Sequence, residues 1–268
     1  MLTIAISTLT SDLDKVFIPP RRPQVRWLIL LQTDLAVESP LELSRPDVKI
    51  VKLDTLGVAK SRNEAITRAP TEFLLFADSG QEYCVDQALK LAAIMRSKPN
   101  LNIAVGQLYD FDNTPRKAYP KKQKRLNRFN CAKIGTPEIM LRTNLIKNKH
   151  IRFDPKFGAG SPTPIGDEYV FLADAINAGL RVEYFPFVLG RHCQHSSGMG
   201  ELDGTALRHR NSVFTRVFGH FAFFARLGFA LKHHRRFLNK MDLWRFVSYP
   251  KALRDGQTAR KDKFTGTQ

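Results

Sequence analysis

The first 200 residues alternate between short apolar runs and segments with helical spacing, and this alternation constrains the fold more than any other feature. Apolar runs of about four to eight residues predict buried strands, whereas apolar residues about three or four positions apart predict amphipathic helices. Strands that alternate with helices favour an α/β fold with a mostly parallel central sheet flanked by helices. Strands are expected at 2–7, 25–31, 48–53, 72–77, 101–106, 139–142 and 181–185, and helices at 57–68, 85–96, near Leu145 and at 167–177.

The end of the chain differs from this pattern, because it reads as helical and strongly basic. From Arg208 onward, 14 Lys and Arg stand against three Asp. We therefore expect an α/β domain over 1–205 and a basic amphipathic helical extension over 206–268. This extension suits a membrane interface, packing on the domain or an oligomer contact, and the sequence leaves all three open. Its apolar residues at helical spacing are Phe214, Val217, Phe218, Phe221, Phe224 and Leu231.

The net charge of the whole chain is +17, with a pI near 10.0. A positive field attracts nucleic acid, anionic lipid headgroups or phosphorylated ligands, and its sign alone does not choose among them. The segment Thr114–Ile134 carries eight basic residues and no acidic residue, which predicts an exposed loop or flap suited to an acidic acceptor. The apolar stretch Val217–Leu231 is too short to span a bilayer comfortably. Three distant cysteines argue against a disulfide scaffold and favour a reducing, cytoplasmic compartment.

Two motifs are suited to a negatively charged ligand. Asp78 ends the apolar strand at 72–77, and ligands of open α/β sheets bind beyond the carboxyl ends of strands. A carboxylate there can hold a hard cation, although Asp is equally common at the start of a turn such as Ser79–Gly80. Arg62 and Asn63 lie in the first turns of the helix after Gly57, where phosphate can bind, or where the side chains are simply solvated.

Two further motifs carry acid–base or metal-binding side chains. Asp167 and Glu168 start a helix after a Gly/Pro-rich loop, where they either complement the helix dipole or present a general base. The loop 192–198 contains two histidines, of which either can bind a metal, although a pair without other ligands usually does not.

The order of these pieces resembles the family-2 glycosyltransferases, whose fold is called GT-A. The resemblance covers about residues 1–200, and it departs from the family at the metal motif, where Asp78-Ser79-Gly80 matches only the first acid. The matching pieces are Leu2–Ser7, Val25–Asp34, Gly57–Asn63, Phe73–Asp78, Phe153–Gly158, Gly166–Leu172 and His195–Gly198.

The resemblance implies a role for each motif. Asp78 and His195 would hold Mn²⁺ or Mg²⁺, and Asp167 or Glu168 would be the base, with the family pattern favouring the second acid. The residues that would bind the nucleotide-sugar are Thr8, Asp34, Arg62, Asn63 and Asp78.

The implied activity is the transfer of a sugar from a UDP- or GDP-sugar to a hydroxyl of a glycan or lipid-linked acceptor, with inversion and metal assistance. The implied setting is bacterial surface polysaccharide or glycolipid synthesis, in the cytoplasm or on the inner, anionic membrane surface, with an oligomer compatible with both. One alternative is a polyanion- or nucleic-acid-binding protein, but no helix-turn-helix, zinc or RNP-type motif appears, so no specific nucleic acid is expected. The other alternative is an inactive relative that binds nucleotide-sugar, because the metal motif is reduced.

Overall fold

The computed structural model describes residues 1–32, 45–192, 203–237 and 240–248. The chain divides into two compact units, Met1–Gly200 and Glu201–Gln268. The first unit contains the sheet, and the described part of the second unit is helical.

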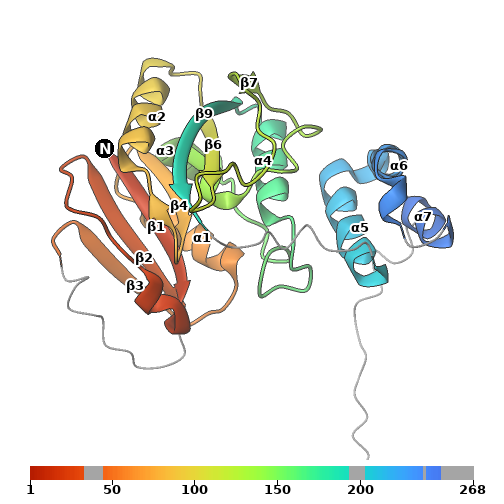
Figure 1. The fold of residues 1–268 in the computed structure, drawn as a ribbon, viewed down its shortest axis with the longest axis horizontal. Coiled ribbons are helices and arrows are strands. Elements are labelled where there is room, and N and C mark those ends of the chain that lie inside the picture. Colours follow the sequence, from red (N-terminus) through yellow and green to blue (C-terminus); the bar gives the residue numbers. More distant parts are fainter. Residues whose placement is uncertain (33–44, 193–202, 238–239, 249–268) are drawn as a thin grey trace, which may run out of the picture. The chain divides into compact units, whose positions relative to one another are not determined.

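A single mixed sheet organises the first unit. Its strands are β1 (Leu2–Leu9), β2 (Val25–Gln32), β3 (Val48–Leu53), β4 (Phe73–Asp78), β5 (Glu82–Tyr83), β6 (Ile103–Tyr109), β7 (Lys124–Arg125), β8 (Ile139–Arg142) and β9 (Val182–Arg191). Within the described residues the order is β3-β2-β1-β4-β8-β6-β9-β5, with β7 paired to β9 (Figure 1). The neighbours from β3 to β4 run parallel, as do β6 and β9, whereas the short β8 runs antiparallel to both of its neighbours.

Helices cover both faces of this sheet. They are η1 (Thr10–Lys15), α1 (Val58–Arg68), α2 (Val85–Ser97), η3 (Thr136–Glu138), α3 (Thr143–Asn148) and α4 (Asp167–Asn177). The fold class expected from the sequence, a mostly parallel α/β sheet with flanking helices and a helical C-terminal region, is confirmed.

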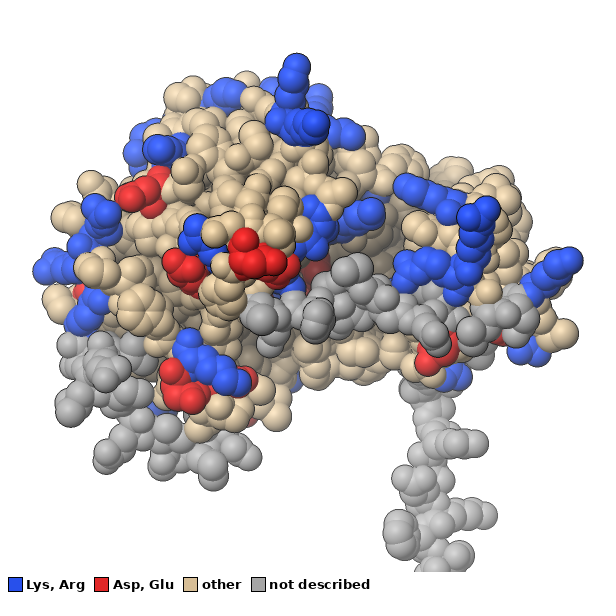
Figure 2. All heavy atoms as spheres, viewed as in Figure 1, with Lys and Arg blue, Asp and Glu red and all other residues tan. Residues whose placement is uncertain are grey.

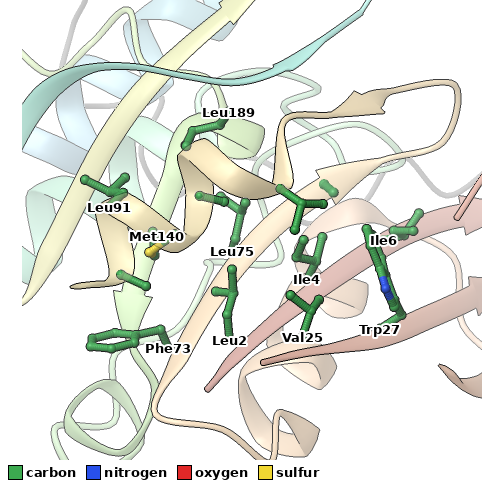
Figure 3. Packing of buried hydrophobic residues seen from close by; sticks show 14 of the residues in the cluster. Leu2, Ile4, Ile6, Val25, Trp27, Phe73, Leu75, Leu91, Met140 and Leu189 are labelled. Carbon is green, nitrogen blue, oxygen red and sulfur yellow. The ribbon is translucent and has the colours of Figure 1, made fainter. Parts of the chain in front are cut away.

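The main core lies between the sheet and α2. Alternate side chains of a strand point to opposite faces, so Leu2, Ile4 and Ile6 of β1 enter this core together (Figure 3). The apolar stripe of α2 closes the core at helical spacing and is fully or nearly fully buried. Its residues are Val85, Ala88, Leu91, Ala92 and Met95.

The opposite face of β1 is small and polar, which lets α1 pack close to the sheet. Ser61 of α1, which is buried, donates a hydrogen bond from Oγ to Ser7 Oγ at 2.8 Å near the end of β1. At the other end of the strand, the hydroxyls of Thr3 and Thr71 are 2.7 Å apart. These bonds satisfy buried hydroxyls that would otherwise be costly to bury.

The basic segment Thr114–Ile134 was expected to be an exposed loop or flap, and the structure instead holds its backbone against the domain. Its strand β7 pairs antiparallel with β9, and Leu126 N donates to Val182 O at 2.9 Å. The hydroxyl of Tyr119 donates to the buried carboxylate of Glu138 at 2.6 Å. The cations still face solvent, as expected: Lys121, Lys122, Lys124 and Arg125 are all exposed.

The second unit is a small helical assembly. Its elements are α5 (Gly204–Phe218), η4 (Gly219–Phe221), α6 (Ala222–Lys232), η5 (His234–Arg236) and α7 (Lys240–Val247). Asp203 caps α5 by accepting a hydrogen bond from Ala206 N at 2.7 Å. The unit has a thin core of three buried residues, Leu207, Ala230 and Phe246, with Phe214 and Phe229 among the half-buried residues around them. No helix in the described ranges is both long enough and apolar enough to cross a membrane.

Candidate functional site

The candidate site lies where β1 and β4 end. These strands are parallel neighbours, with Ser7 in register with Asp78, so their carboxyl ends meet at one edge of the sheet. The first turns of α1 and α4 reach the same edge, because Arg62 of α1 contacts both Asp78 and Asp167. Three segments far apart in the sequence therefore converge at the place where α/β sheets bind ligands.

The loop after Phe157 seats the start of α1. Val58 N donates to Ala159 O at 3.1 Å, and Gly57 N donates to the Gln32 side chain at 2.8 Å. Gly57 has a φ of +119°, a conformation that glycine tolerates far better than other residues. Because these two amides already have protein partners, the helix start offers a phosphate fewer open donors than the sequence suggests.

Gly158 is required at its position for steric reasons. Its φ is +91°, and a Cβ built there would lie 2.7 Å from Asp167 Cγ and 2.8 Å from a methyl group of Val58. The glycine that ends the Phe153–Gly158 motif thus leaves room for the carboxylate of Asp167.

Arg62 is the centre of the site. Its Nη1 donates a hydrogen bond to Asp167 Oδ2, and its Nη2 lies 3.8 Å from Asp78 Oδ1. The residue is 8% exposed. The 3.8 Å separation is an ion pair without a hydrogen bond, so Nη2 keeps hydrogen-bonding capacity toward the edge of the sheet.

The charges around Arg62 offset the cost of its burial. Burial is the largest single effect on the pKa of Arg62 and lowers it, but attraction to Asp167, Asp78 and Glu168 raises the pKa by more. The guanidinium is therefore a permanent cation in a mostly buried place, held by acids on two different elements.

Aromatic rings pack against one side of the Arg62 guanidinium. The Arg62 guanidinium carbon lies 5.7 Å from the centroid of the Phe153 ring, which stacks on Phe171 at 4.2 Å. Phe76 of β4 meets Phe153 edge-on at 5.4 Å. A cation on a ring face is favoured electrostatically, and packed rings have few alternative arrangements, so both effects fix the position of Arg62.

The two acids at the start of α4 differ in their surroundings. Asp167 is 4% exposed and forms the salt bridge with Arg62. Glu168 has intermediate surface exposure, so its carboxylate is partly desolvated. This desolvation is the largest effect on the pKa of Glu168, and together with the neighbouring charge of Asp167 it raises that pKa well above the usual value, despite opposition from Arg62.

His192 is a residue whose position the sequence did not reveal. It directly follows β9, is 4% exposed, and its Nε2 lies 3.2 Å from Ser79 O in the turn after Asp78. Burial lowers the pKa of His192, while the charge of Asp78 acts in the opposite direction. The sequence predicts that this strand ends at Phe185. In the structure, β9 continues to Arg191 by pairing with β5 and β6, and this places His192 beside the turn after Asp78.

The remaining predicted ligands have different surroundings. Thr8 is 2% exposed on β1, and its hydroxyl donates to Leu9 O at 3.1 Å. Asn63 uses its amide on the backbone of Phe153, donating to Phe153 O and accepting from Phe153 N, both at 2.8 Å. Ligand roles for these two residues stay predictions. Asp34 and His195 lie outside the described residues.

The chemistry of a cation site is only partly present in the described part of the chain. No group of three or more His, Cys, Asp and Glu side chains there is arranged to hold a metal ion. Asp78, with its side chain 33% exposed, supplies one carboxylate, and a guanidinium lies 3.8 Å from it. The described side chains alone therefore do not fit a bound Mn²⁺ or Mg²⁺.

A separate hollow of about 600 Å³ lies at the start of α2. Its lining includes Pro20, Arg22, Tyr83 and Arg191, and none of the predicted site residues. Two of its cations already have acidic partners, since Arg22 pairs with Asp86 at 3.4 Å and Arg191 with Glu82 at 3.2 Å. This hollow is thus distinct from the convergence around Arg62.

The strand order and the site at the carboxyl edge define a GT-A fold, the fold of nucleotide-sugar transferases. Among solved structures, the chain is similar to Staphylococcus aureus TarS, a GT-A family-2-like glycosyltransferase, with a TM-score of 0.55 and 17% identity over 91% of this chain. It spans about half of that protein, 47% of its length.

Two structures of TarS 1–349 with ligands give similar results. The complex with UDP-GlcNAc has a TM-score of 0.57 and 17% identity over 91% of this chain and 78% of that one. The complex with UDP has a TM-score of 0.54 and 17% identity over 92% and 81%. No protein-family model matches the sequence, and no curated protein matches it in sequence. The comparisons therefore establish the shared fold.

Proposed function

We propose that this protein is a glycosyltransferase that takes its sugar from a nucleotide-diphosphate sugar, with a UDP-sugar as the first candidate. The observation that carries the proposal is the buried Arg62 between Asp78 and Asp167 at the carboxyl edge of a GT-A sheet. Support for a UDP-sugar comes from the similarity to TarS, which has been solved with UDP-GlcNAc and with UDP.

Arg62 would act on the donor diphosphate. Departure of a nucleoside diphosphate requires stabilisation of the negative charge that develops on it, and a fixed cation in a desolvated place does this well. Nη1 is occupied by Asp167, so Nη2 is the donor that we assign to a phosphate oxygen. Asp167 would be a positioning residue, because its carboxylate holds the guanidinium in this orientation.

Glu168 would be the general base. Its raised pKa makes it a stronger base than an ordinary glutamate, whereas the carboxylate of Asp167 is already occupied by its salt bridge to Arg62. In a single inverting displacement, the acceptor oxygen forms its bond to the anomeric carbon while the bond from that carbon to the phosphate oxygen breaks. The acceptor proton passes to Glu168, and the nucleoside diphosphate leaves with the bonding electrons.

Metal assistance remains part of the proposal as a separate hypothesis. A bound divalent cation would supply additional charge neutralisation at the diphosphate. Asp78 is the described residue assigned to it, and His195 is the second assigned ligand. Binding of Mn²⁺ or Mg²⁺ would therefore depend on the donor diphosphate to complete the ligand shell.

The wider setting that we propose is bacterial surface polysaccharide or glycolipid synthesis. The exposed cations of the segment Thr114–Ile134 favour a phosphate-bearing or acidic acceptor, since they lie on a segment whose backbone is fixed by β9. Electrostatic attraction of this kind raises association rates and weakens with salt.

The test of the proposed function is donor binding followed by turnover. UDP and GDP are added with and without Mn²⁺, and the thermal midpoint is measured, because a ligand bound only by the folded state raises it. A panel of nucleotide-sugars is then screened for released nucleoside diphosphate. We expect a shift with UDP, a smaller shift in Asp78→Ala, and an unchanged shift in the control Asp14→Ala, which alters an exposed carboxylate. Absence of any shift under all metal conditions would refute the proposal.

A further inference from the structure

The second unit has exposed apolar side chains on η4, α6 and α7. Seven large apolar side chains there are at least 36% exposed, and two of them, Leu231 and Trp244, exceed two thirds. They follow one another in a short part of the chain, whereas apolar residues on ordinary surfaces are scattered singly. The set, called the α6–α7 face below, is Phe221, Phe223, Phe224, Leu227, Leu231, Met241 and Trp244.

The exposed residues of α6 form one continuous stripe. Residues 223, 227 and 231 are spaced four apart, so they lie one above the other on a helix, and Phe224 lies beside them. The rings of Phe223 and Phe224 are in contact, with centroids 5.5 Å apart. The inward side of α6 is occupied by different residues, since Ala222 and Ala230 are buried.

This arrangement divides into two groups the apolar residues that the sequence places at helical spacing from Phe214 to Leu231. Phe214, Val217 and Phe218 of α5 are buried or half-buried, and Phe214 packs against the core of the unit. The later residues, Phe224 and Leu231, stay outside it. The unit therefore has enough apolar side chains to build its small core and a second set that its own fold leaves in water.

The charge beside the α6–α7 face is mostly positive, and the acid within it, Asp242, lies 4.0 Å from Arg245. No acidic residue occurs between Asp203 and Asp242. Figure 2 shows Lys and Arg gathered over this unit. The exposed cations that come next to the apolar residues along the chain are Lys232, Arg235, Arg236, Lys240 and Arg245.

We propose that the α6–α7 face docks this protein onto an anionic phospholipid surface. The apolar stripe and Trp244 would enter the headgroup region, and the neighbouring cations would pair with lipid phosphates. A second copy of the chain fits this face less well, because the cations of one copy would then lie opposite the same cations of the other. The aromatic rings of the face can stack on nucleic-acid bases but the aliphatic Leu227 and Leu231 cannot, whereas acyl chains accept both kinds of side chain. The inference goes beyond the proposed function and does not rest on it.

The test is co-sedimentation of the full chain with vesicles. Vesicles of phosphatidylcholine alone are compared with vesicles that also contain phosphatidylglycerol, at low and high salt. We expect binding to the anionic vesicles, weakening as salt screens the cations. The double variant Phe224→Ser/Leu231→Ser should reduce the partition coefficient by at least about tenfold, because two large apolar groups no longer enter the lipid.

The matched control is Phe17→Ser. Phe17 lies in the first unit and is 66% exposed, the same fraction as Phe224, so Phe17→Ser is compared with the single variant Phe224→Ser, which removes equal apolar exposure at a different place. Phe17→Ser should bind vesicles as the unchanged protein does. Equal losses in the two variants would overturn the assignment to the α6–α7 face.

Tryptophan fluorescence gives an independent reading. Trp244 is 71% exposed, and Trp27, the other tryptophan, is 2% exposed in the core of the first unit. Anionic vesicles should shift the emission to shorter wavelength, and Trp244→Phe should abolish the shift. The proposal is overturned if neither vesicle type binds, if the double variant binds normally, or if light scattering shows a dimer that the double variant dissociates while vesicles have no effect. UDP binding is measured on the same samples, so failure here is distinguishable from failure of the proposed function.

Discussion

The two units of this protein differ in which departure from the usual distribution of residues they concentrate at one place. The first unit buries charged side chains, because Arg62 and Asp167 lie almost wholly inside it. The second unit exposes apolar side chains, with Phe224 and Trp244 mostly in water. Burying charge and exposing apolar surface both cost free energy, so neither is retained for the stability of the isolated fold. Under the two proposals, each unit is shaped for a different binding partner, one a small anionic ligand and the other an anionic surface with an apolar interior.

The largest expected effect tests the ligand site of the first unit and comes from replacing the proposed base, Glu168. Glu168→Gln should lower turnover by about 10²–10⁴-fold, because no group takes the acceptor proton, while UDP affinity stays unchanged. Asp167→Asn should instead weaken UDP binding, since Arg62 loses the carboxylate that positions it. The measurements are initial rates and UDP titration calorimetry. Full turnover in both variants would exclude both acids as the base.

The second prediction concerns the cost of the buried charge. Arg62→Leu should destabilise the first unit by about 3–5 kcal/mol, because Asp167 is left buried without its partner. Arg68→Leu is the control on the same helix. Its partner Glu64 lies at 2.6 Å on the surface, and breaking such an exposed pair costs about 0.5 kcal/mol or less. Urea unfolding, followed by Trp27 fluorescence in a Trp244→Phe background, measures both. Equal effects would contradict the special role of the buried pair.

The third prediction concerns the space kept for Asp167. Gly158→Ala should cost about 2–4 kcal/mol, because the added methyl group meets Asp167 and Val58 in addition to the strain of a positive φ. Gly179→Ala is the matched control, with a φ of +80° and no atom within 4 Å of the added carbon. It should cost about 1–2 kcal/mol, the strain alone. The same unfolding assay decides, and a difference near zero would show that the contact relaxes freely.

The smallest expected effect is the pH dependence of Glu168. Its pKa in the folded protein is raised above 4.5, so the folded state holds this proton more tightly than the unfolded state. The stability contributed by the protonated group is complete below pH 4.5 and is lost as the pH rises through the folded-state pKa. Glu168→Gln should therefore gain stability relative to the unchanged protein as the pH increases from about 4.5. Parallel stability curves over that range would contradict the raised pKa.

The sequence predicts the local elements of the first unit well, because each carries its own periodicity. The spans 48–53, 139–142 and 167–177 agree with β3, β8 and α4 to the residue. The segment Thr114–Ile134 was harder, because its attachment depends on pairing with β9, more than 50 residues later. No local pattern encodes such a partner.

The candidate site shows the same division. Arg62, Asp78 and Asp167 could be selected from motifs, and the structure brings all three together. The salt bridge between Arg62 and Asp167 was not predicted, since it joins residues 105 positions apart. His192 was missed as a neighbour of the Asp78 turn because the second half of β9 contains Pro186 and shifts in register against β6, so it lacks a clean strand pattern.

The amide of Asn63 couples two parts of the site that specificity engineering would treat as independent modules. It accepts from and donates to the backbone of Phe153, so the helix that carries Arg62 and the loop that leads to Glu168 are joined by two hydrogen bonds. Aspartate at position 63 would lose the donor, and leucine would lose both partners. A chimaera that replaces residues 151–166 with a foreign loop should therefore also include the α1 helix of the donor protein. Otherwise the new loop will lack the two hydrogen bonds that hold it to α1.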